Sequence, residues 1–369
     1  MAKFLAVNWR DLRNPDAGGA EVHLHEILTR MASRGHEVTL LATGFPGGEA
    51  EDRYDGLRVI RRGSWYNANF VLALHARRWL ERNPVDLVIE DINKIPFFLP
   101  ALVKTPVLAV VPHLFGATVF RETNFLFAGY VYLWEKLIPW VYRNCRFAVI
   151  SPSTKSDLLE RGIDEENIDV VLCGLDHDTY RLLDGTRRYE APTIIHFGRM
   201  RKYKSIDVVI DAFARIHGEL PEARLVIVGD GPERENLVGA ARRHRLGASV
   251  EFTGAVATGE LVKLLNRAHL FLNASPKEGW GLTVVEANAC GLPVIASDRP
   301  GLRDSVLDGR TGYLVEYGDV EAFAARSLEL LADAGKWSRM SGEAAEWARS
   351  LTWDKTAEEM EEIFMKEME

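Results

Sequence analysis

Apolar residues in this chain fall into short continuous runs that alternate with segments of helical spacing. Runs such as Phe4–Trp9, Val38–Ala42 and Val107–Val111 lack regular polar positions, which is typical of parallel strands covered on both faces. Between the first two runs, apolar residues in Ala20–Ser33 recur every three or four positions, which predicts an amphipathic helix. The pattern therefore predicts an α/β fold built on a parallel sheet.

The same alternation occurs twice along the chain, on either side of a polar stretch at 184–192 that contains Gly185 and Pro192 and predicts a linker. The strands predicted before it are Phe4–Trp9, Val38–Ala42, Leu57–Ile60, Leu87–Glu90, Val107–Val111, Phe147–Ile150 and Ile168–Leu172. Those predicted after it are Thr193–Phe197, Leu225–Val228, Val250–Phe252, Leu270–Asn273, Pro293–Ala296 and Tyr313–Val315.

Two such series predict two Rossmann-like, doubly wound domains that face each other across a cleft. We expect a first domain over 1–183 and a second over 184–350. Residues 351–369 are expected to form a helix that packs back toward the first domain. In such folds ligands bind at the carboxyl ends of the strands, so candidate chemistry is sought there.

Composition and charge narrow the classes of function. The chain is 47% apolar and 27% charged, as expected of a globular protein, and its net charge of −8 argues against nucleic-acid binding as the main activity. Residues 1–160 hold 19 basic and 17 acidic side chains, a net of +2, so the remainder carries −10. That asymmetry fits either a basic surface facing an anionic partner or scattered solvated arginines.

Three cysteines without a C-x-x-C pair argue against a disulfide framework or a structural zinc site and fit a reducing cytoplasm. The longest apolar stretch, Val107–Phe120, is interrupted by Pro112, His113 and Gly116 and is too short to span a bilayer. We see no signal peptide and expect a cytoplasmic protein. Peripheral contact with the inner face of the membrane, through the first domain, is an open alternative.

The segment from Leu270 to Cys290 carries the most chemistry. It reads as a strand, a loop with two glycines, and a helix, an arrangement whose free N–H groups form an anion site. Glu278 in the loop and Glu286 in the helix could accept hydrogen bonds from hydroxyl groups. A ligand with an anion and several hydroxyls describes a nucleotide sugar, whereas each glutamate alone would fit a solvated helix start.

A second segment supplies positive charge. Arg199 follows the strand Thr193–Phe197 directly after Gly198, and Lys204 follows after a short basic loop. Arginine offers a fixed fork and lysine a point charge to a diphosphate. The alternative is an ordinary basic loop on the surface.

These segments resemble a known family. The carrying motifs are Gly198-Arg199 with Lys204, Val228-Gly-Asp-Gly-Pro232, Phe252-Thr-Gly254, Glu278-x7-Glu286 and Gly291-Leu-Pro-Val-Ile295. Over nearly the whole chain they are similar to glycosyltransferase family 4. The resemblance implies a GT-B fold, a retaining glycosyltransferase and a nucleotide-sugar co-substrate, with no cofactor and no metal.

The resemblance also assigns donor-site residues. It implies that Arg199 and Lys204 bind the diphosphate, that Glu278 holds hydroxyls of the transferred sugar, and that Glu286 binds ribose. The backbone would line the sugar and phosphate pocket at Gly279, Trp280, Gly281 and Leu282. Trp280 departs from the family pattern, which often has Phe at this position.

In the first domain the resemblance gives weight to residues that are weak signals alone. Gly18 and Gly19, a glycine pair between the first strand and helix, would close over the donor phosphate. His113 follows a strand and would lie near the reacting sugar, so it joins Glu278, Arg199 and Lys204 as a predicted catalytic group. Glu90 and Asp91 end another strand and are candidates for acceptor binding, as is Trp65.

Two features stay ambiguous in the sequence. Asp176-His177-Asp178 spells a D-x-D metal motif, but it lies where the family has its hinge, with Cys173 replacing the usual Asn, so we expect no metal there. The segment Phe115–Tyr142 is rich in aromatic residues interleaved with Arg121, Lys136 and Arg143. It could lie on a membrane interface or pack on the first-domain core.

The sequence therefore predicts transfer of a hexose-type sugar from a UDP- or GDP-linked donor to a hydroxyl of a glycan, a glycolipid or a small molecule, with cell-envelope glycan or glycolipid synthesis as the setting. A sugar-nucleotide epimerase or hydrolase on the same scaffold is the nearest alternative. An NAD-dependent oxidoreductase is disfavoured because Arg234 stands where a dinucleotide fingerprint needs its third glycine. A non-enzymatic sugar- or lipid-binding protein is a more distant alternative.

Overall fold

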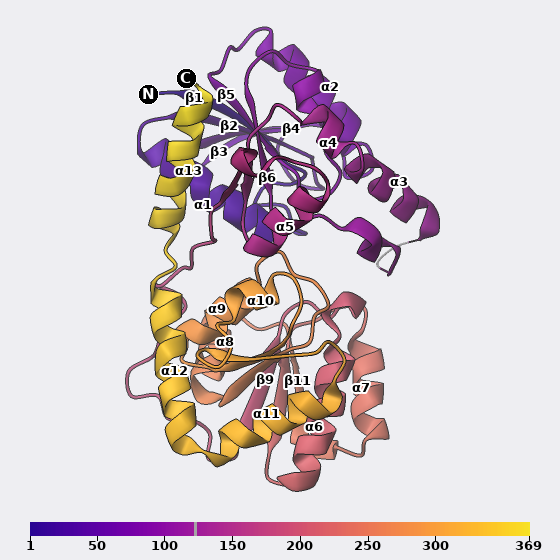
Figure 1. Cartoon of the computed structure of the whole chain (residues 1–369), viewed down its shortest axis with the longest axis vertical. Coiled ribbons are helices and arrows are strands. Elements are labelled where there is room, and N and C mark those ends of the chain that lie inside the picture. Colours follow the sequence, from indigo (N-terminus) through magenta and orange to yellow (C-terminus); the bar gives the residue numbers. More distant parts are fainter. Residues whose placement is uncertain (122–123) are drawn as a thin grey trace. The chain divides into compact units, whose positions relative to one another are not determined.

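The computed structural model describes residues 1–121 and 124–369 and divides the chain into two compact units (Figure 1). The first unit contains Met1–Gly174 and Trp353–Glu369, and the second contains Leu175–Thr352. The division falls before the boundary at 183/184 that the sequence suggested. Residues 122 and 123, within the aromatic segment singled out above, lie outside the described part.

The first unit is built on an eight-stranded sheet with the order β3-β4-β2-β1-β5-β6-β7-β8. All neighbouring strands are parallel except β3 and β4, which form an antiparallel pair at the edge. The strands are β1 (Lys3–Val7), β2 (Glu37–Ala42), β3 (Glu51–Tyr54), β4 (Leu57–Arg61), β5 (Leu87–Asp91), β6 (Val107–Val111), β7 (Phe147–Val149) and β8 (Ile168–Val170).

Helices cover both faces of this sheet, as the continuous apolar runs require. The helices are α1 (Gly19–Ser33), α2 (Ala68–Leu80), α3 (Phe125–Glu135), α4 (Ile138–Val141), α5 (Pro152–Glu160) and the C-terminal α13 (Trp353–Glu367). Leu28 of α1 and Phe364 of α13 are buried together over one face. Leu72 of α2, Val131 of α3 and Leu158 of α5 are buried over the other. The last helix of the chain thus completes the core of the first unit.

The second unit has a six-stranded, fully parallel sheet with the order β11-β10-β9-β12-β13-β14. Its strands are β9 (Thr193–Phe197), β10 (Arg224–Val228), β11 (Val250–Gly254), β12 (Leu270–Asn273), β13 (Val294–Ser297) and β14 (Gly312–Val315). Its helices are α6 (Ile206–Glu219), α7 (Arg234–Arg243), α8 (Thr258–Arg267), α9 (Leu282–Ala289), α10 (Leu302–Ser305), α11 (Val320–Ala332) and α12 (Ala334–Arg349).

Strand order locates where each sheet can bind a ligand. In the first unit the direction of chain progression reverses between β1 and β5, and in the second it reverses between β9 and β12. The loops that leave the carboxyl ends of strands at such a switch point diverge and leave a crevice for ligands. The predicted site segments follow these four strands, except that His113 follows β6 and Trp65 follows β4.

The predicted fold class, two Rossmann-like doubly wound sheets, is confirmed. That the two units face each other across a cleft stays a prediction. The antiparallel edge strand β3 was not predicted, because Glu51–Tyr54 has no apolar run. Across residues 1–121 and 124–369, no helix has the length and apolar character needed to cross a membrane.

Candidate functional site

The predicted cations of the second unit lie on the loop that follows β9 at the switch point. Gly198 has φ 141°, a value that favours glycine, and it turns the chain so that Arg199 is exposed. A single 3₁₀ turn, η4 (Lys202–Lys204), then leads through Ser205 into α6. Arg199 has no carboxylate within ion-pair distance among the described residues, so its guanidinium is available to an anion.

The Gly229-Asp-Gly231 motif after β10 holds this loop in place. Gly229 has φ 129°, and a Cβ added there would lie 2.0 Å from the carbonyl oxygen of Gly198. At Gly231 a Cβ would lie 2.4 Å from the carbonyl oxygen of Met200. Backbone therefore packs on backbone, and the Met200 amide donates to the Asp230 carbonyl at 2.9 Å. The motif acts as a support for Arg199.

Lys204 and Glu278, predicted separately, lie in direct contact. The Lys204 Nζ is 2.6 Å from the Glu278 Oε1, and both side chains are largely covered. Burial disfavours the charged lysine, but the charge of Glu278 outweighs it and raises the pKa of Lys204. The pair joins the loop after β9 to the loop after β12 across the switch point. A cation and a carboxylate that can accept hydrogen bonds therefore lie side by side there.

The start of α9 lies beside this pair. Gly281, at φ 92°, caps the helix, and a Cβ there would meet Ser305 Oγ at 2.9 Å. Gly301 approaches the backbone of Glu278 so closely that a Cβ would lie 2.3 Å from its carbonyl oxygen. These glycines pack the loop against the start of α10. The first amides of α9 thus follow directly on the loop that carries Glu278, and helix polarity favours an anion at them.

Glu286 lies one turn further along α9. Burial raises its pKa to about 7, while a hydrogen bond from Tyr180 and the charge of Lys204 act in the opposite direction. The Tyr180 hydroxyl donates to this carboxylate, which leaves further acceptor capacity for a ligand. Tyr180 was not predicted, because it lies far from α9 in the sequence and no motif marks it.

Two buried aromatic groups near the pair have an unpaired nitrogen. Trp280 is 2% exposed, and its Nε1 has no partner among the described residues, so the side chain packs into the core while its backbone lines the loop. His196 donates from Nδ1 to the Leu272 carbonyl at 2.8 Å, and burial lowers its pKa to about 4. A histidine in the apolar strand Thr193–Phe197 was a signal that sequence reasoning did not use.

In the first unit, the glycine loop is braced by a charge pair. Gly18 caps α1, and its amide donates to Glu21 Oε2 at 2.7 Å. Lys94, in the loop after β5, lies 3.2 Å from Glu21 Oε1. Burial opposes ionisation of Glu21, but Lys94 and the amide lower its pKa overall. Gly18 and Gly19 thus occupy the β1/β5 switch point on a supported loop.

The structure gives Glu90 a supporting position. Its carboxylate is fully buried and accepts from the amides of Phe97 at 2.7 Å and Leu99 at 3.1 Å, and from the hydroxyl of Tyr142 at 2.5 Å. Burial raises its pKa to about 7 against these donors. With its oxygens engaged, Glu90 stabilises the loop after β5, and this placement weakens its candidacy as an acceptor ligand.

Asp91 is also fully buried, and burial together with the charge of Glu21 raises its pKa well above the ordinary value. Its Oδ2 accepts from Asn93 at 3.3 Å, and its Oδ1 has no hydrogen-bond partner among the described residues. His113 is half-buried two residues beyond β6, with its ring 5.0 Å from that of Phe115. Trp65 is 66% exposed ahead of α2.

The D-x-D segment is engaged in local structure. Asp176 Oδ1 accepts from the amides of Asp178 and Thr179, and His177 Nε2 lies 2.9 Å from the Leu351 carbonyl. Within the described ranges, no cluster of three or more His, Cys, Asp or Glu side chains could hold a metal ion.

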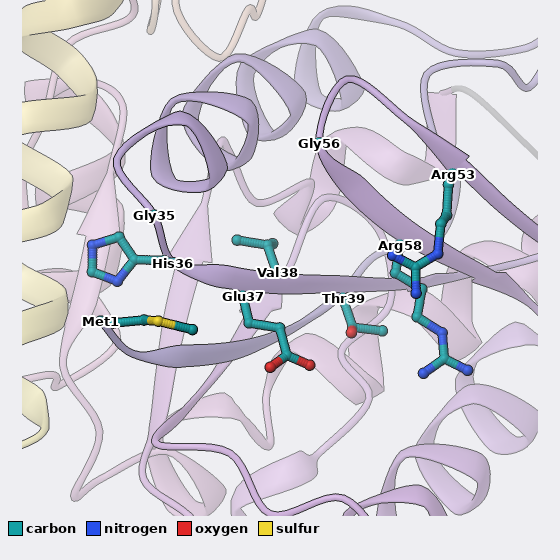
Figure 2. Close-up of a pocket in the computed structure, with 9 residues that line it drawn as sticks. All are labelled: Met1, Gly35, His36, Glu37, Val38, Thr39, Arg53, Gly56 and Arg58. Atoms are coloured by element: carbon teal, nitrogen blue, oxygen red, sulfur yellow. The ribbon is translucent and has the colours of Figure 1, made fainter.

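A cavity of about 280 Å³ lies elsewhere in the first unit, lined by residues such as Glu37, Arg53 and Arg58 (Figure 2). Glu37 begins β2, so this cavity is at the amino end of that strand. It is therefore remote from the carboxyl end, where the predicted residues lie.

Fold and site together define a protein of two doubly wound units, in the second of which Lys204 and Glu278 pair at the switch point. Residues 184–347 match the family model "Glycosyl transferases group 1", and residues 17–179 match "Glycosyltransferase Family 4". The chain belongs to this family, has the GT-B fold, and is a glycosyltransferase that uses nucleotide-sugar donors.

Individual similarities extend over nearly the whole chain. A GDP-mannose-dependent alpha-(1-6)-phosphatidylinositol monomannoside mannosyltransferase of Mycobacterium tuberculosis is 28% identical over 93% of each chain. The sucrose-phosphate synthase structure from Thermosynechococcus elongatus has a TM-score of 0.84 at 20% identity, covering 99% of each chain. The Anabaena Alr3699/HepE structure in complex with UDP-glucose has a TM-score of 0.77 at 18% identity, covering 99% of this chain and 100% of that one.

Proposed function

We propose that this protein is a retaining glycosyltransferase that moves a hexose-type sugar from a UDP- or GDP-linked donor to a hydroxyl of a glycan, a glycolipid or a small molecule. The observation that carries the proposal is the Lys204–Glu278 pair at the β9/β12 switch point, next to the unpaired Arg199 and the first amides of α9. This arrangement supplies positive charge for a diphosphate and a carboxylate for sugar hydroxyls.

In the donor complex, Arg199, Lys204 and the α9 amides hold the diphosphate. As the glycosidic bond breaks, negative charge grows on the departing diphosphate, and these groups stabilise it more in the transition state than in the ground state. They do the electrostatic work for which other glycosyltransferases employ a metal ion. The donor site therefore requires no added metal.

The two glutamates have separate tasks on the donor. Glu278 accepts hydrogen bonds from hydroxyls of the transferred sugar, and the backbone from Gly279 to Leu282 lines its pocket. Glu286 accepts hydrogen bonds from the ribose hydroxyls, while the Tyr180 hydroxyl donates another hydrogen bond to the same carboxylate. A half-buried carboxylate whose hydrogen-bond capacity is only partly used gains most from a hydroxyl-bearing ligand.

The first unit supplies the groups that meet the reacting sugar and the acceptor. Gly18 and Gly19 cover the donor phosphate, and His113 lies near the sugar. The acceptor hydroxyl attacks from the face that the diphosphate leaves, which preserves the anomeric configuration without a protein nucleophile. Asp91 and Trp65 are retained as acceptor-side candidates, and the cytoplasm is the proposed compartment.

The test is a thermal-shift screen of the wild-type chain against UDP-, GDP- and ADP-sugars, followed by product analysis with the donor that raises the melting temperature most. The proposal expects transfer to an added acceptor with the anomeric configuration kept. Release of free sugar or of an epimer at the same rate without any acceptor would instead establish the hydrolase or epimerase alternative.

A further inference from the structure

Helix α3 (Phe125–Glu135) is apolar on nearly every side, which is unusual for a helix at the surface of a globular unit. Its sequence, FLFAGYVYLWE, contains one ionisable acid, Glu135. That carboxylate points inward, where it accepts from the amides of Phe115 at 2.6 Å and Gly116 at 2.7 Å. The outward side of α3 therefore offers no charge to water.

Large apolar side chains occupy that outward side. Leu126 is 85% exposed, Leu133 is 60% exposed, and Trp140, in the short α4 that follows, is 79% exposed. Leu126 and Leu133 are seven residues apart and so lie on one side of the helix. The inward positions Ala128 and Val131 are buried in the core. Helix α3 thus already packs on the core of this unit through other residues, and the exposed side chains are not needed for that packing.

Helix α2, which contacts α3, also carries exposed apolar side chains. Phe70 and Leu74, one turn apart, are 58% and 49% exposed. Asn69 of α2 donates to the hydroxyl of Tyr130 of α3, so the two helices are neighbours (Figure 1). We call the set the aromatic flank, and it consists of Phe70, Leu74, Leu126, Leu133, Leu137 and Trp140.

Exposed cations lie on and next to the helices that carry the aromatic flank. Within 64–83 and 124–145, the exposed basic side chains are Arg77, Arg78, Arg82, Lys136 and Arg143, and the only exposed carboxylate is Glu81. In the described part of the chain, none of these five cations lies within ion-pair distance of a carboxylate. The whole chain carries −8, so this concentration of positive charge is local.

We propose that the aromatic flank docks on the surface of an anionic lipid bilayer. The leucine and aromatic side chains enter the boundary between head groups and acyl chains, and the arginines contact the lipid phosphates. A second copy of this chain is a poorer occupant, because pairing the flank with itself would bring the five cations of each copy together. The helices lie on the bilayer and do not cross it.

The test measures binding of the full chain to vesicles of phosphatidylcholine alone and of phosphatidylcholine mixed with phosphatidylglycerol. Wild type is expected to partition strongly onto the mixed vesicles. The triple variant Leu126→Gln, Leu133→Gln, Trp140→Gln should lose at least about 100-fold of that partitioning, since each side chain leaves the apolar boundary. Arg77→Gln with Arg78→Gln should lose about tenfold on the mixed vesicles only.

The matched control is Met365→Gln on α13, which is 48% exposed in the same unit but outside the flank; its partitioning should equal wild type. All replaced side chains are exposed, and identical thermal unfolding establishes that each variant is folded. Donor-nucleotide binding, whose proposed residues in both units lie outside the aromatic flank, should be unchanged in every variant. This readout separates failure of the docking proposal from failure of the proposed function.

Three outcomes would overturn the proposal. The first is a folded wild type that binds neither kind of vesicle. The second is a triple variant that partitions like wild type. The third is a dimer in solution that Leu133→Gln dissociates while vesicle binding is absent, which would assign the flank to self-association.

Discussion

Glu90 in the first unit and Glu286 in the second have the same raised pKa, about 7, and the same main cause, burial. Their surroundings differ. Glu90 accepts from two backbone amides and a tyrosine hydroxyl, whereas Tyr180 is the one hydrogen-bond donor that acts on the pKa of Glu286. A shifted carboxylate is therefore no sign of a ligand site by itself. What distinguishes Glu286 is hydrogen-bonding capacity that the fold leaves unused.

The two switch points repeat this contrast on a larger scale. In the first unit, Lys94 pairs with Glu21, and Glu21 accepts from the Gly18 amide, so these charged groups stabilise a loop. In the second unit, Arg199 has no ion-pair partner among the residues that the structure describes, and Lys204 pairs with Glu278 in the loop before α9. The same strand order thus places a supported loop in one unit and a cationic site in the other.

The largest expected effect tests the second switch point. Glu278→Gln removes the charge that holds Lys204 and weakens the acceptor for sugar hydroxyls, so turnover should fall about 100-fold or more. Steady-state kinetics with the cognate donor measure it. Glu316→Gln, at an exposed glutamate just beyond β14, is the control and should keep wild-type turnover. Equal turnover of Glu278→Gln and wild type would remove Glu278 from the site.

The next effect tests the first unit. Glu90→Ala leaves two backbone amides and the Tyr142 hydroxyl buried without an acceptor, which should lower the free energy of unfolding by about 3 kcal/mol. Urea unfolding measures the loss, and nucleotide affinity of the folded variant should stay unchanged. A stable variant with impaired acceptor use would instead return Glu90 to the acceptor site.

A backbone substitution tests the support under Arg199. Gly229→Ala places a Cβ against the Gly198 carbonyl and should displace the cationic loop, weakening nucleoside-diphosphate affinity about tenfold in calorimetry. Gly218→Ala is the control, because Gly218 lies in α6 without a positive φ, and a Cβ added there would meet no neighbouring atom within 4 Å. Equal affinities for the two variants would show that the loop does not depend on this packing.

The smallest effect concerns pH. The folded-state pKa of Glu90 and of Glu286 is about 7, above the ordinary 4.5, so the fold favours their protonated forms. Their contribution to stability is present below pH 4.5 and is lost progressively as pH rises through 7. Glu286→Gln should flatten this part of the unfolding profile. An unchanged profile would contradict the burial of Glu286.

Most of the strands could be predicted, because continuous apolar runs report two-sided burial regardless of what covers them. The edge strand β3 could not, since its residues Glu51–Tyr54 are polar and its pairing with β4 is a property of the hairpin. The division at Gly174/Leu175 falls beside the segment that the resemblance marks as the hinge, but the domain boundary was predicted at 183/184. It depends on distant contacts such as that of His177 with Leu351, whereas the sequence drew attention to a polar linker further on.

The donor-site candidates stand out in the sequence because each lies in a short motif with a clear electrostatic meaning, and their roles stay predictions. Their pairing could not be predicted, since 74 positions separate Lys204 from Glu278 and only the sheet brings them together. The hydrogen bonds of Glu90 could not be predicted either: an acid at the end of a strand resembles a ligand, and only the structure shows that the amides of Phe97 and Leu99 donate to it. Local sequence reports chemistry but not which hydrogen bonds are already made.

The account's central claim is that Arg199 and Lys204 bind a diphosphate. The direct measurement is calorimetric affinity for the cognate nucleoside diphosphate in Arg199→Ala and Lys204→Ala, each beside a neighbouring control, Arg201→Ala and Lys202→Ala, whose side chains are exposed on the same loop. Affinity should fall at least about tenfold in the first pair, as expected for lost charge-assisted hydrogen bonds, and less than about twofold in the second. Equal affinity in all four variants would contradict the claim.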